Sequence, residues 1–218
     1  MEKLDFNYIQ EYITADEGEL HHIYGKPKNG KTYLATKMAL EDLMRGQTVI
    51  ANWKIKWEGY DERKNKLLVF LGLLGLKKEF WDIPKDNFIF LDPNDENIPT
   101  RIATLTDCSI YLDEGQRYYD SYLLTRMDNN VRMALALTAH FNRRIIVISQ
   151  RSSAIHVSLR GNVNRFFKME KLFSIFGWTR FCVSEFLEMT GESPDEEKIE
   201  SQDYFWGDKK IYESYDFK

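Results

Sequence analysis

The chain has 218 residues, a hydrophobic content of 43%, an aromatic content of 14% and a formal net charge of −4 at pH 7. This length favours one α/β domain that buries roughly 70% of its unfolded surface, and the composition excludes global disorder. The negative net charge excludes a general basic field, so a nucleic-acid-binding surface would have to be local.

The first residues, MEKLDFNYIQEY, are acidic and contain no continuous apolar stretch, so we expect no signal peptide. The longest apolar run, residues 67–76, has about half the length of a membrane-spanning helix, so we expect no integral membrane span. A buried helix, a partner-docking segment and a peripheral membrane contact are the alternatives for this run. Cys108 and Cys182 have neither metal-ligand nor disulfide-framework spacing, which indicates small core residues in a reducing compartment.

Residues 25–32, GKPKNGKT, form a complete G-x-x-x-x-G-K-[ST] phosphate-binding loop. An apolar strand pattern at 20–24 precedes the loop and a helical pattern follows it from Thr32, which is the context that such a loop requires. We expect backbone N–H groups and the Lys31 charge to bind the phosphates of ATP, and the Thr32 hydroxyl to bind Mg²⁺. The residues expected to contact the nucleotide are Gly25, Lys26, Pro27, Lys28, Asn29, Gly30, Lys31, Thr32 and Tyr33.

Further elements follow in chain order. Short runs of β-branched and aromatic residues predict buried strands at 48–52, 88–92, 109–112 and 145–148. Helical patterns occur at about 66–80, 99–106, 128–142 and 154–163. Near-continuous apolar strands suit a parallel sheet that is covered on both faces, so the sequence predicts an α/β fold with a mainly parallel central sheet.

The end of the chain differs in character from this core. Residues 165–170 and 179–184 alternate enough to form a terminal pair of strands around the turn at 176–178. From about residue 190 the sequence is polar and acidic, so we expect it to lie on the surface or dock on a partner. The expected organisation is an ATPase domain at 1–190, with an insertion at about 53–87, and an acidic tail at 191–218.

A second motif completes the expected nucleotide site. The apolar run 109–112 ends in Asp113 and Glu114, which is the form of a Walker B strand that carries an acid to the carboxyl edge of the sheet. We expect Asp113 and Thr32 to bind Mg²⁺ from two sides. Glu114 is then the candidate general base for the attacking water. An Asp-Glu pair at a strand end is typical of hydrolysing ATPases.

Two further polar roles remain to be filled. Gln150 follows the strand 145–148, where motor ATPases place a polar sensor of the γ-phosphate, and Ser149 is the other candidate. A transition-state arginine can come from a neighbouring subunit. The candidates in the second half of the chain are Arg126, Arg132, Arg143, Arg144, Arg160 and Arg165. We favour Arg144 and Arg160, although a lone arginine is more often a surface or salt-bridge residue.

Together these residues resemble the zonular occludens toxin (Zot) family, which includes assembly proteins of filamentous phages. The resemblance covers roughly residues 18–170 and is carried by the segments 24–32, 50–52, 111–116, 140–150 and 155–165. It implies a three-layer RecA-like core of the FtsK–HerA class of P-loop motors, which assemble into rings and thread or extrude polymers. It also implies nucleotide and Mg²⁺ binding by Lys31 and Thr32, Mg²⁺ binding and water activation by Asp113 and Glu114, and sensing by Gln150.

Filamentous-phage members typically continue into a transmembrane helix, and we expect none in this sequence. We therefore expect either a truncated or soluble version of such a protein or a second task of the same motor class, the packaging of a viral genome. The expected partners are further copies of the chain in a ring, DNA or nucleoprotein, and phage capsid or assembly proteins. The expected location is the host cytoplasm, with virion or membrane association as alternatives. A P-loop small-molecule kinase and a non-hydrolysing nucleotide-binding scaffold are the competing functions; no arginine-rich lid supports the first, and the second leaves Glu114 without a role.

Overall fold

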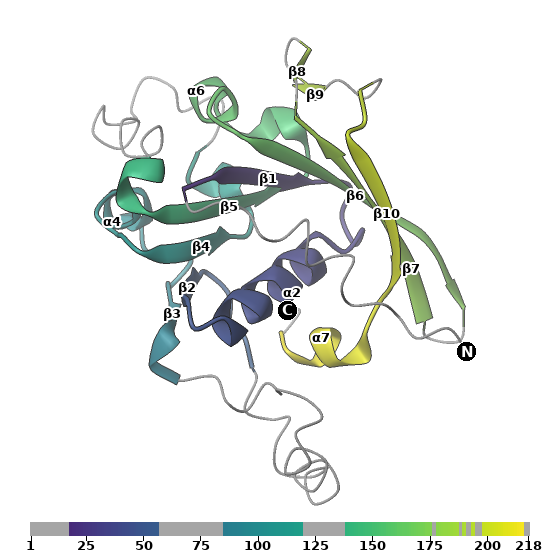
Figure 1. Ribbon diagram of the computed structural model, residues 1–218, viewed down its shortest axis with the longest axis horizontal. Helices are drawn as coiled ribbons and strands as arrows, with labels where there is room; N and C mark the ends of the chain where they lie inside the picture. Colours follow the sequence, from purple (N-terminus) through teal and green to yellow (C-terminus); the bar gives the residue numbers. More distant parts are fainter. Residues whose placement is uncertain are drawn as a thin grey trace, which may run out of the picture.

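A computed structural model describes residues 18–56, 85–119, 138–175, 178–187, 189–190, 193–194 and 198–215 (Figure 1). Several expectations lie outside these residues: the apolar run 67–76, the helix at 66–80, most of the helix at 128–142, and Arg126 and Arg132. Within the described part of the chain, no helix is both long enough and apolar enough to cross a bilayer.

One eight-stranded sheet forms the centre of the fold, in the order β10-β7-β6-β1-β5-β4-β2-β3. Its strands are β1 (Leu20–Tyr24), β2 (Thr48–Ala51), β3 (Phe88–Phe90), β4 (Cys108–Leu112), β5 (Arg143–Ser149), β6 (Arg165–Ile175), β7 (Trp178–Phe186) and β10 (Ser201–Trp206). The neighbouring strands from β3 to β6 are all parallel, whereas β6 with β7 and β7 with β10 are antiparallel. The mainly parallel sheet is therefore confirmed.

Short helices connect and cover these strands. The α-helices are α2 (Lys31–Met44), α4 (Ile98–Ala103), α6 (Val157–Arg160) and α7 (Lys209–Glu213). The 3₁₀ turns are η3 (Lys85–Asn87), η4 (Gly115–Arg117), η5 (Ala139–Phe141) and η6 (Ser152–Ala154), and β8 (Met189–Thr190) pairs with β9 (Ser193–Pro194) as a separate ribbon. Helix α2 crosses one face of the sheet, with α7 beside it (Figure 1).

Strand β5 explains why the sheet is covered on both faces. Ile146 and Ile148 belong to the core cluster on the α2 side, whereas Ile145 and Val147 belong to the cluster that includes residues of α4 and α6. All four side chains are fully buried. Because successive strand residues point to opposite faces, a continuous apolar run buries both faces of the sheet.

The last described residues differ from the expected acidic tail. Strand β10 pairs with β7 from Ser201 to Trp206 and forms one edge of the sheet. Phe205, Ile211 and Tyr215 are buried in the core cluster beside α2. Residues 201–215 are thus part of the domain, because every second residue of β10 faces the sheet core even though the segment is polar on average.

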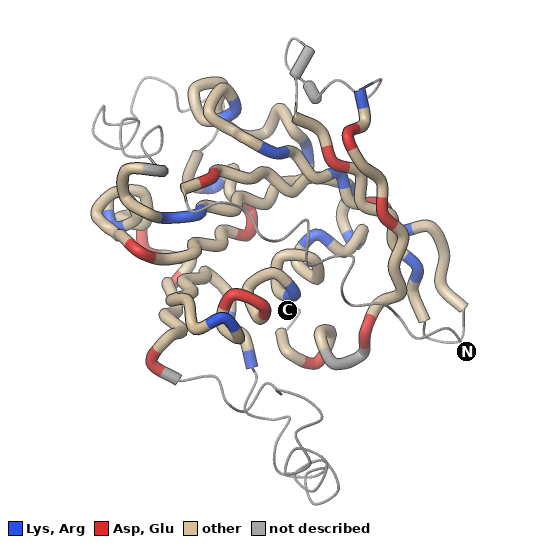
Figure 2. Tube along the Cα trace, in the orientation of Figure 1, with Lys and Arg blue, Asp and Glu red and all other residues tan. Residues whose placement is uncertain are grey.

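Charges of both signs are distributed along the whole trace of the described residues (Figure 2). This agrees with the small net charge of −4. We therefore look for function in the local chemistry at the carboxyl edge of the sheet, where ligands bind in open α/β sheets.

Candidate nucleotide-binding site

The phosphate loop connects β1 to α2 and lies against β6. A Cβ atom at Gly25, where φ is +149°, would lie 2.4 Å from the Met169 carbonyl oxygen, so a side chain has no room there. The Asn29 side-chain amide donates to the same carbonyl oxygen over 3.2 Å. Gly30, with φ +88°, is the left-handed residue immediately before α2, and it packs against the Phe181 ring. These contacts fix the loop in the curved form that can surround a phosphate group.

Lys31 is the first residue of α2 and carries the loop's principal charge. Its Nζ donates to the Lys26 carbonyl oxygen over 3.0 Å, which folds the side chain back over the loop. Burial lowers the pKa of Lys31, and the Asp113 carboxylate opposes that shift. The ammonium group is thus held above the loop, where it can exchange the carbonyl for a phosphate oxygen.

Thr32 and Asp113 come together from α2 and the end of β4. The Thr32 hydroxyl donates to Asp113 Oδ2 over 2.7 Å, and the Glu114 backbone N–H donates to Asp113 Oδ1 over 2.8 Å. A hydroxyl beside a carboxylate is a donor set that Mg²⁺ accepts when phosphate oxygens and water complete its shell, so these residues fit the ion. Bound Mg²⁺ would supply charge neutralisation at the phosphates.

Asn52, which follows β2, positions Asp113 and had no assigned role in the sequence analysis. Its side-chain carbonyl accepts from the Asp113 backbone N–H over 2.8 Å, and its amide donates to the Asp113 carbonyl oxygen over 2.9 Å. The amide also donates to the Tyr118 hydroxyl over 3.1 Å. The available sequence signal was its place as a polar residue at the end of a strand that neighbours β4.

A cavity of about 340 Å³ joins these groups at the carboxyl edge of the sheet. It is lined by Pro27, Lys28, Gly30, Lys31, Thr32, Asn52, Trp53, Pro93, Asp113, Glu114, Gln116, Arg117, Ser149, Gln150 and Tyr215. The structure therefore places the loop lysine, the Thr32–Asp113 pair, Glu114 and Gln150 around one space. Glu114 has a left-handed backbone, with φ +50° and ψ +47°, and such strain in a non-glycine residue is concentrated at functional sites.

Ser149 and Gln150 differ in their freedom to contact a nucleotide. The Ser149 hydroxyl donates to the Arg151 carbonyl oxygen over 2.6 Å, so it accepts from His22 Nε2 at 2.8 Å. His22 is fully buried, and burial lowers its pKa to about 3, so its ring stays neutral. Gln150 is exposed at the cavity, which leaves it as the better sensor candidate of the two.

One residue assigned to the site from sequence, Tyr33, belongs to the domain core. Tyr33 is buried, its ring stacks on Phe181 and Phe205, and its hydroxyl accepts from the Asp208 backbone N–H over 2.8 Å. It does not line the cavity. Trp53, to which the sequence analysis assigned no role at the site, lines the cavity, and its Nε1–H donates to the Thr36 hydroxyl over 3.2 Å. Tyr33 directly follows the loop in the sequence, but the periodicity of helix α2 directs its side chain away from the cavity and into the core.

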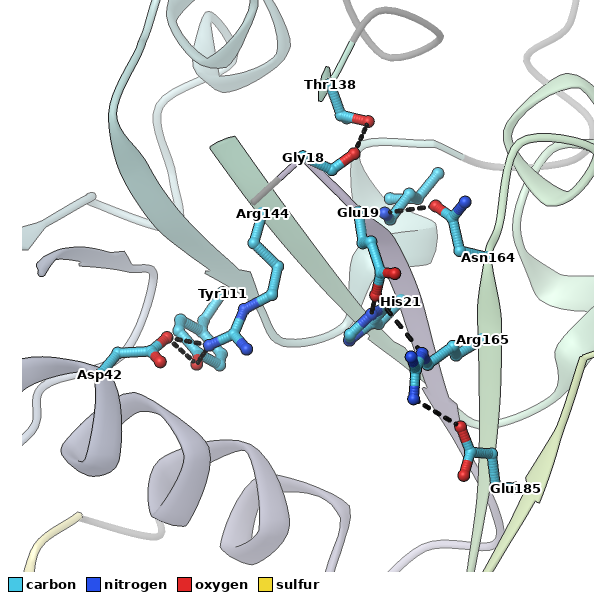
Figure 3. Close-up of polar contacts among 11 residues, drawn as sticks. Gly18, Glu19, His21, Asp42, Tyr111, Thr138, Arg144, Asn164, Arg165 and Glu185 are labelled. Atoms are coloured by element: carbon cyan, nitrogen blue, oxygen red, sulfur yellow. Dashed lines mark hydrogen bonds and ion pairs between the residues drawn. The ribbon is translucent and has the colours of Figure 1, made fainter. Parts of the chain in front are cut away.

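Arg144 requires the clearest correction. It is the second residue of β5, so it lies near the amino edge of the parallel strands, opposite the phosphate loop. Only 6% of its side chain is exposed; it forms an ion pair with Asp42 and donates to the Tyr111 hydroxyl over 3.0 Å (Figure 3). Although burial opposes the charge, Tyr111 and Asp42 raise the pKa of Arg144. Arg144 is a structural cation of its own subunit.

The other described arginine candidates are also engaged. Arg160 is buried in α6, and Arg143 is buried and donates to the Ile102 carbonyl oxygen over 2.6 Å. Arg165 contacts Glu19 at 3.4 Å and Glu185 at 3.2 Å, in the cluster that Figure 3 shows beside His21. Arg117, which was not a candidate, is the one arginine among the described residues that lines the cavity.

A phosphate loop between β1 and α2, with an Asp-Glu pair at the end of β4 and the parallel strand β5 between β1 and β4, is the arrangement of a RecA-like P-loop fold. The sequence profile of the family described as zonular occludens toxin (Zot) matches residues 20–216. The chain belongs to the Zot family. A search of curated proteins found no similar sequence.

Solved structures agree with this fold. The N-terminal domain of zonular occludens toxin from Neisseria meningitidis has a TM-score of 0.55 and 16% identity, over 92% of this chain and 100% of that one. The flagellar accessory protein FlaH from Methanocaldococcus jannaschii has a TM-score of 0.50 and 12% identity, over 84% of this chain and 85% of that one. The RadB recombinase has a TM-score of 0.50 and 18% identity, over 87% of each chain. At these identities the likeness establishes the fold alone.

Proposed function

We propose that this protein is an ATP-hydrolysing motor of the Zot type, which drives phage assembly or export or translocates DNA during genome packaging. One observation carries the proposal. The Thr32 hydroxyl and the Asp113 carboxylate are 2.7 Å apart, and Glu114 faces the same cavity as Lys31. A cation-binding pair beside a solvent-exposed carboxylate suits hydrolysis of the phosphoanhydride bond of ATP, whereas nucleotide binding alone gives Glu114 no task.

Each side chain has a distinct task in the proposed reaction. Lys31 moves from the Lys26 carbonyl oxygen to the phosphates of ATP and neutralises part of their charge. Thr32 and Asp113 hold Mg²⁺. Glu114 accepts a proton from the attacking water, and Gln150 contacts the terminal phosphate from the end of β5. Asn52 keeps Asp113 in place through its two hydrogen bonds to the Asp113 backbone.

We further propose that the working form is a ring-like homo-oligomer in the host cytoplasm, acting on DNA or nucleoprotein together with phage capsid or assembly proteins. Membership of the Zot family supports this proposal. Since Arg144 and Arg160 are buried within their own subunit, any arginine donated in trans must come from another position.

The experiment is ATPase measurement on wild type and Glu114→Gln, with nucleotide binding measured on both and DNA present or absent. A hydrolytic motor predicts that the variant binds ATP like the wild type but loses turnover, and that DNA or oligomerisation raises the wild-type rate. Mass spectrometry of a phosphorylated small product would identify a kinase instead. Binding without turnover under every DNA condition would identify a scaffold. Native mass spectrometry with ATP counts the subunits.

A further inference from the structure

Arg117 faces Glu114 at the mouth of the nucleotide cavity. It is the last residue of η4, and its Nη1 lies 3.7 Å from Glu114 Oε2. The Arg117 side chain is 51% exposed and the Glu114 side chain is 57% exposed. Both line the cavity that contains Lys31 and the Thr32–Asp113 pair. The candidate base is thus ion-paired to a cation that can itself reach the cavity.

The backbone that carries Arg117 is held firmly. A Cβ atom at Gly115 would lie 2.2 Å from Val147 Cγ1, so η4 is in close contact with β5. The Tyr118 hydroxyl donates to the Pro93 carbonyl oxygen over 3.3 Å and accepts from Asn52. Tyr119 is buried, and its carbonyl oxygen accepts from the His156 backbone N–H over 2.8 Å. These contacts anchor the backbone next to Arg117, whose long side chain is half exposed.

Charge and solvent exposure decide which partner Arg117 prefers. An exposed ion pair at 3.7 Å is screened by water and contributes little to stability, so it costs little to break. A phosphate group carries more charge than a carboxylate and accepts paired guanidinium hydrogen bonds. A triphosphate bound at Lys31 therefore competes well for Arg117, whereas a diphosphate lacks the terminal group.

We propose that Arg117 exchanges Glu114 for the terminal phosphate of the bound nucleotide. With no triphosphate in the cavity, Arg117 keeps the Glu114 carboxylate ion-paired. With a triphosphate bound, Arg117 supplies positive charge to the terminal phosphate and leaves Glu114 free to accept the proton of the attacking water. This inference rests on the proposed ATPase function and adds an arginine from the same subunit to the site.

The test compares binding of a non-hydrolysable ATP analogue and of ADP, each with Mg²⁺, to wild type, Arg117→Gln and Arg117→Lys. Because Arg117→Gln removes one charged contact to the terminal phosphate, we expect about a tenfold loss of affinity for the analogue and unchanged ADP affinity. Arg117→Lys should recover part of the loss. The matched control is Arg101→Gln, which removes another exposed arginine, ion-paired to Asp95 at 2.8 Å and not lining the cavity.

Turnover provides the second readout. We expect Arg117→Gln to lower kcat by about 10²-fold or more, because a transition-state charge is lost, with a smaller change in KM. An unchanged ratio of analogue to ADP affinity in a folded Arg117→Gln protein would overturn the inference and leave Arg117 as a surface ion-pair residue. The binding ratio is independent of hydrolysis, so an inactive wild type would refute the proposed function without deciding the role of Arg117.

Discussion

The buried contact among Asp42, Tyr111 and Arg144 yields a prediction that separates a structural arginine from a catalytic one. The Asp42 side chain is 1% exposed, and its Oδ2 accepts from the Tyr111 hydroxyl over 2.6 Å and from Arg144. Replacing Arg144 with Met leaves the buried Asp42 carboxylate with only the more distant Arg45, whose Nη1 is 3.9 Å from Asp42 Oδ1, and replacing Asp42 with Asn leaves the buried Arg144 charge without its carboxylate partner. The expected cost is about 3–5 kcal/mol of unfolding free energy for either single variant.

This cost translates into a large thermal shift. For a domain of this size, 1 kcal/mol corresponds to about 2–4 °C in Tm, so each single variant should unfold about 6–20 °C earlier than the wild type. The assay is thermal and urea unfolding followed by circular dichroism. Asp95→Asn is the matched control: it breaks the exposed ion pair with Arg101 and should change stability by less than about 1 kcal/mol.

The double variant Asp42→Asn with Arg144→Met removes both charges together. It should be less destabilised than the sum of the single variants, because no unpaired charge remains buried. If Arg144→Met instead kept wild-type stability and lost only ATPase activity, the structural assignment would be refuted. Arg144 would then return as a candidate for donation in trans.

Three further predictions concern pH, packing and metal positioning. Burial lowers the pKa of His22 to about 3, below an unfolded value of about 6.5, so its contribution to stability is present above pH 6.5 and is lost as pH falls towards 3. Burial raises the pKa of Glu41 to about 7, so the Glu41 contribution to stability falls as pH rises between about 4.5 and 7, opposite to that of His22. The His22 effect is therefore measured as the difference between wild type and His22→Asn in urea unfolding at pH 6.5 and at pH 4.5. An equal change in unfolding free energy between these two pH values in both proteins would contradict it. Gly115→Ala should cost about 1–3 kcal/mol because its Cβ would lie 2.2 Å from a methyl group of β5, whereas Gly161→Ala, whose nearest contact is 3.6 Å, should be near neutral in the same thermal assay. Asn52→Ala should raise the Mg²⁺ concentration needed for half-maximal ATPase activity, since it removes two hydrogen bonds that hold the Asp113 backbone; an unchanged Mg²⁺ dependence would contradict this role.

The sequence alone predicted the parts of the fold that depend on local pattern. The strand before the loop, the helix after it and the strand before Asp113 are each defined by a short periodic run, and the structure has them as β1, α2 and β4. The same holds for the β6–β7 hairpin, although both strands are longer than expected. The parallel sheet followed because its central strands are apolar on both faces.

Long-range placement could not be predicted in this way. Strand β10 pairs with β7 because Phe205 and its neighbours bury one face, but its composition is polar and only the tertiary contact identifies it. Arg144 carries no local sign that Asp42, distant in the sequence, neutralises it. Asn52 and Arg117 likewise acquire their roles from residues brought close by the fold. Short motifs predict which residues can carry out the chemistry, whereas the contacts between residues that are distant in the sequence depend on tertiary packing.

The most direct test of the central claim is phosphate release by Glu114→Gln in a single turnover, with ATP affinity measured on the same preparation. The account predicts wild-type affinity with phosphate release slowed by at least about 10²-fold, because the general base is lost while Lys31, Thr32 and Asp113 remain. Phosphate release at the wild-type rate would show that Glu114 is not the base, and would contradict the proposed hydrolytic site.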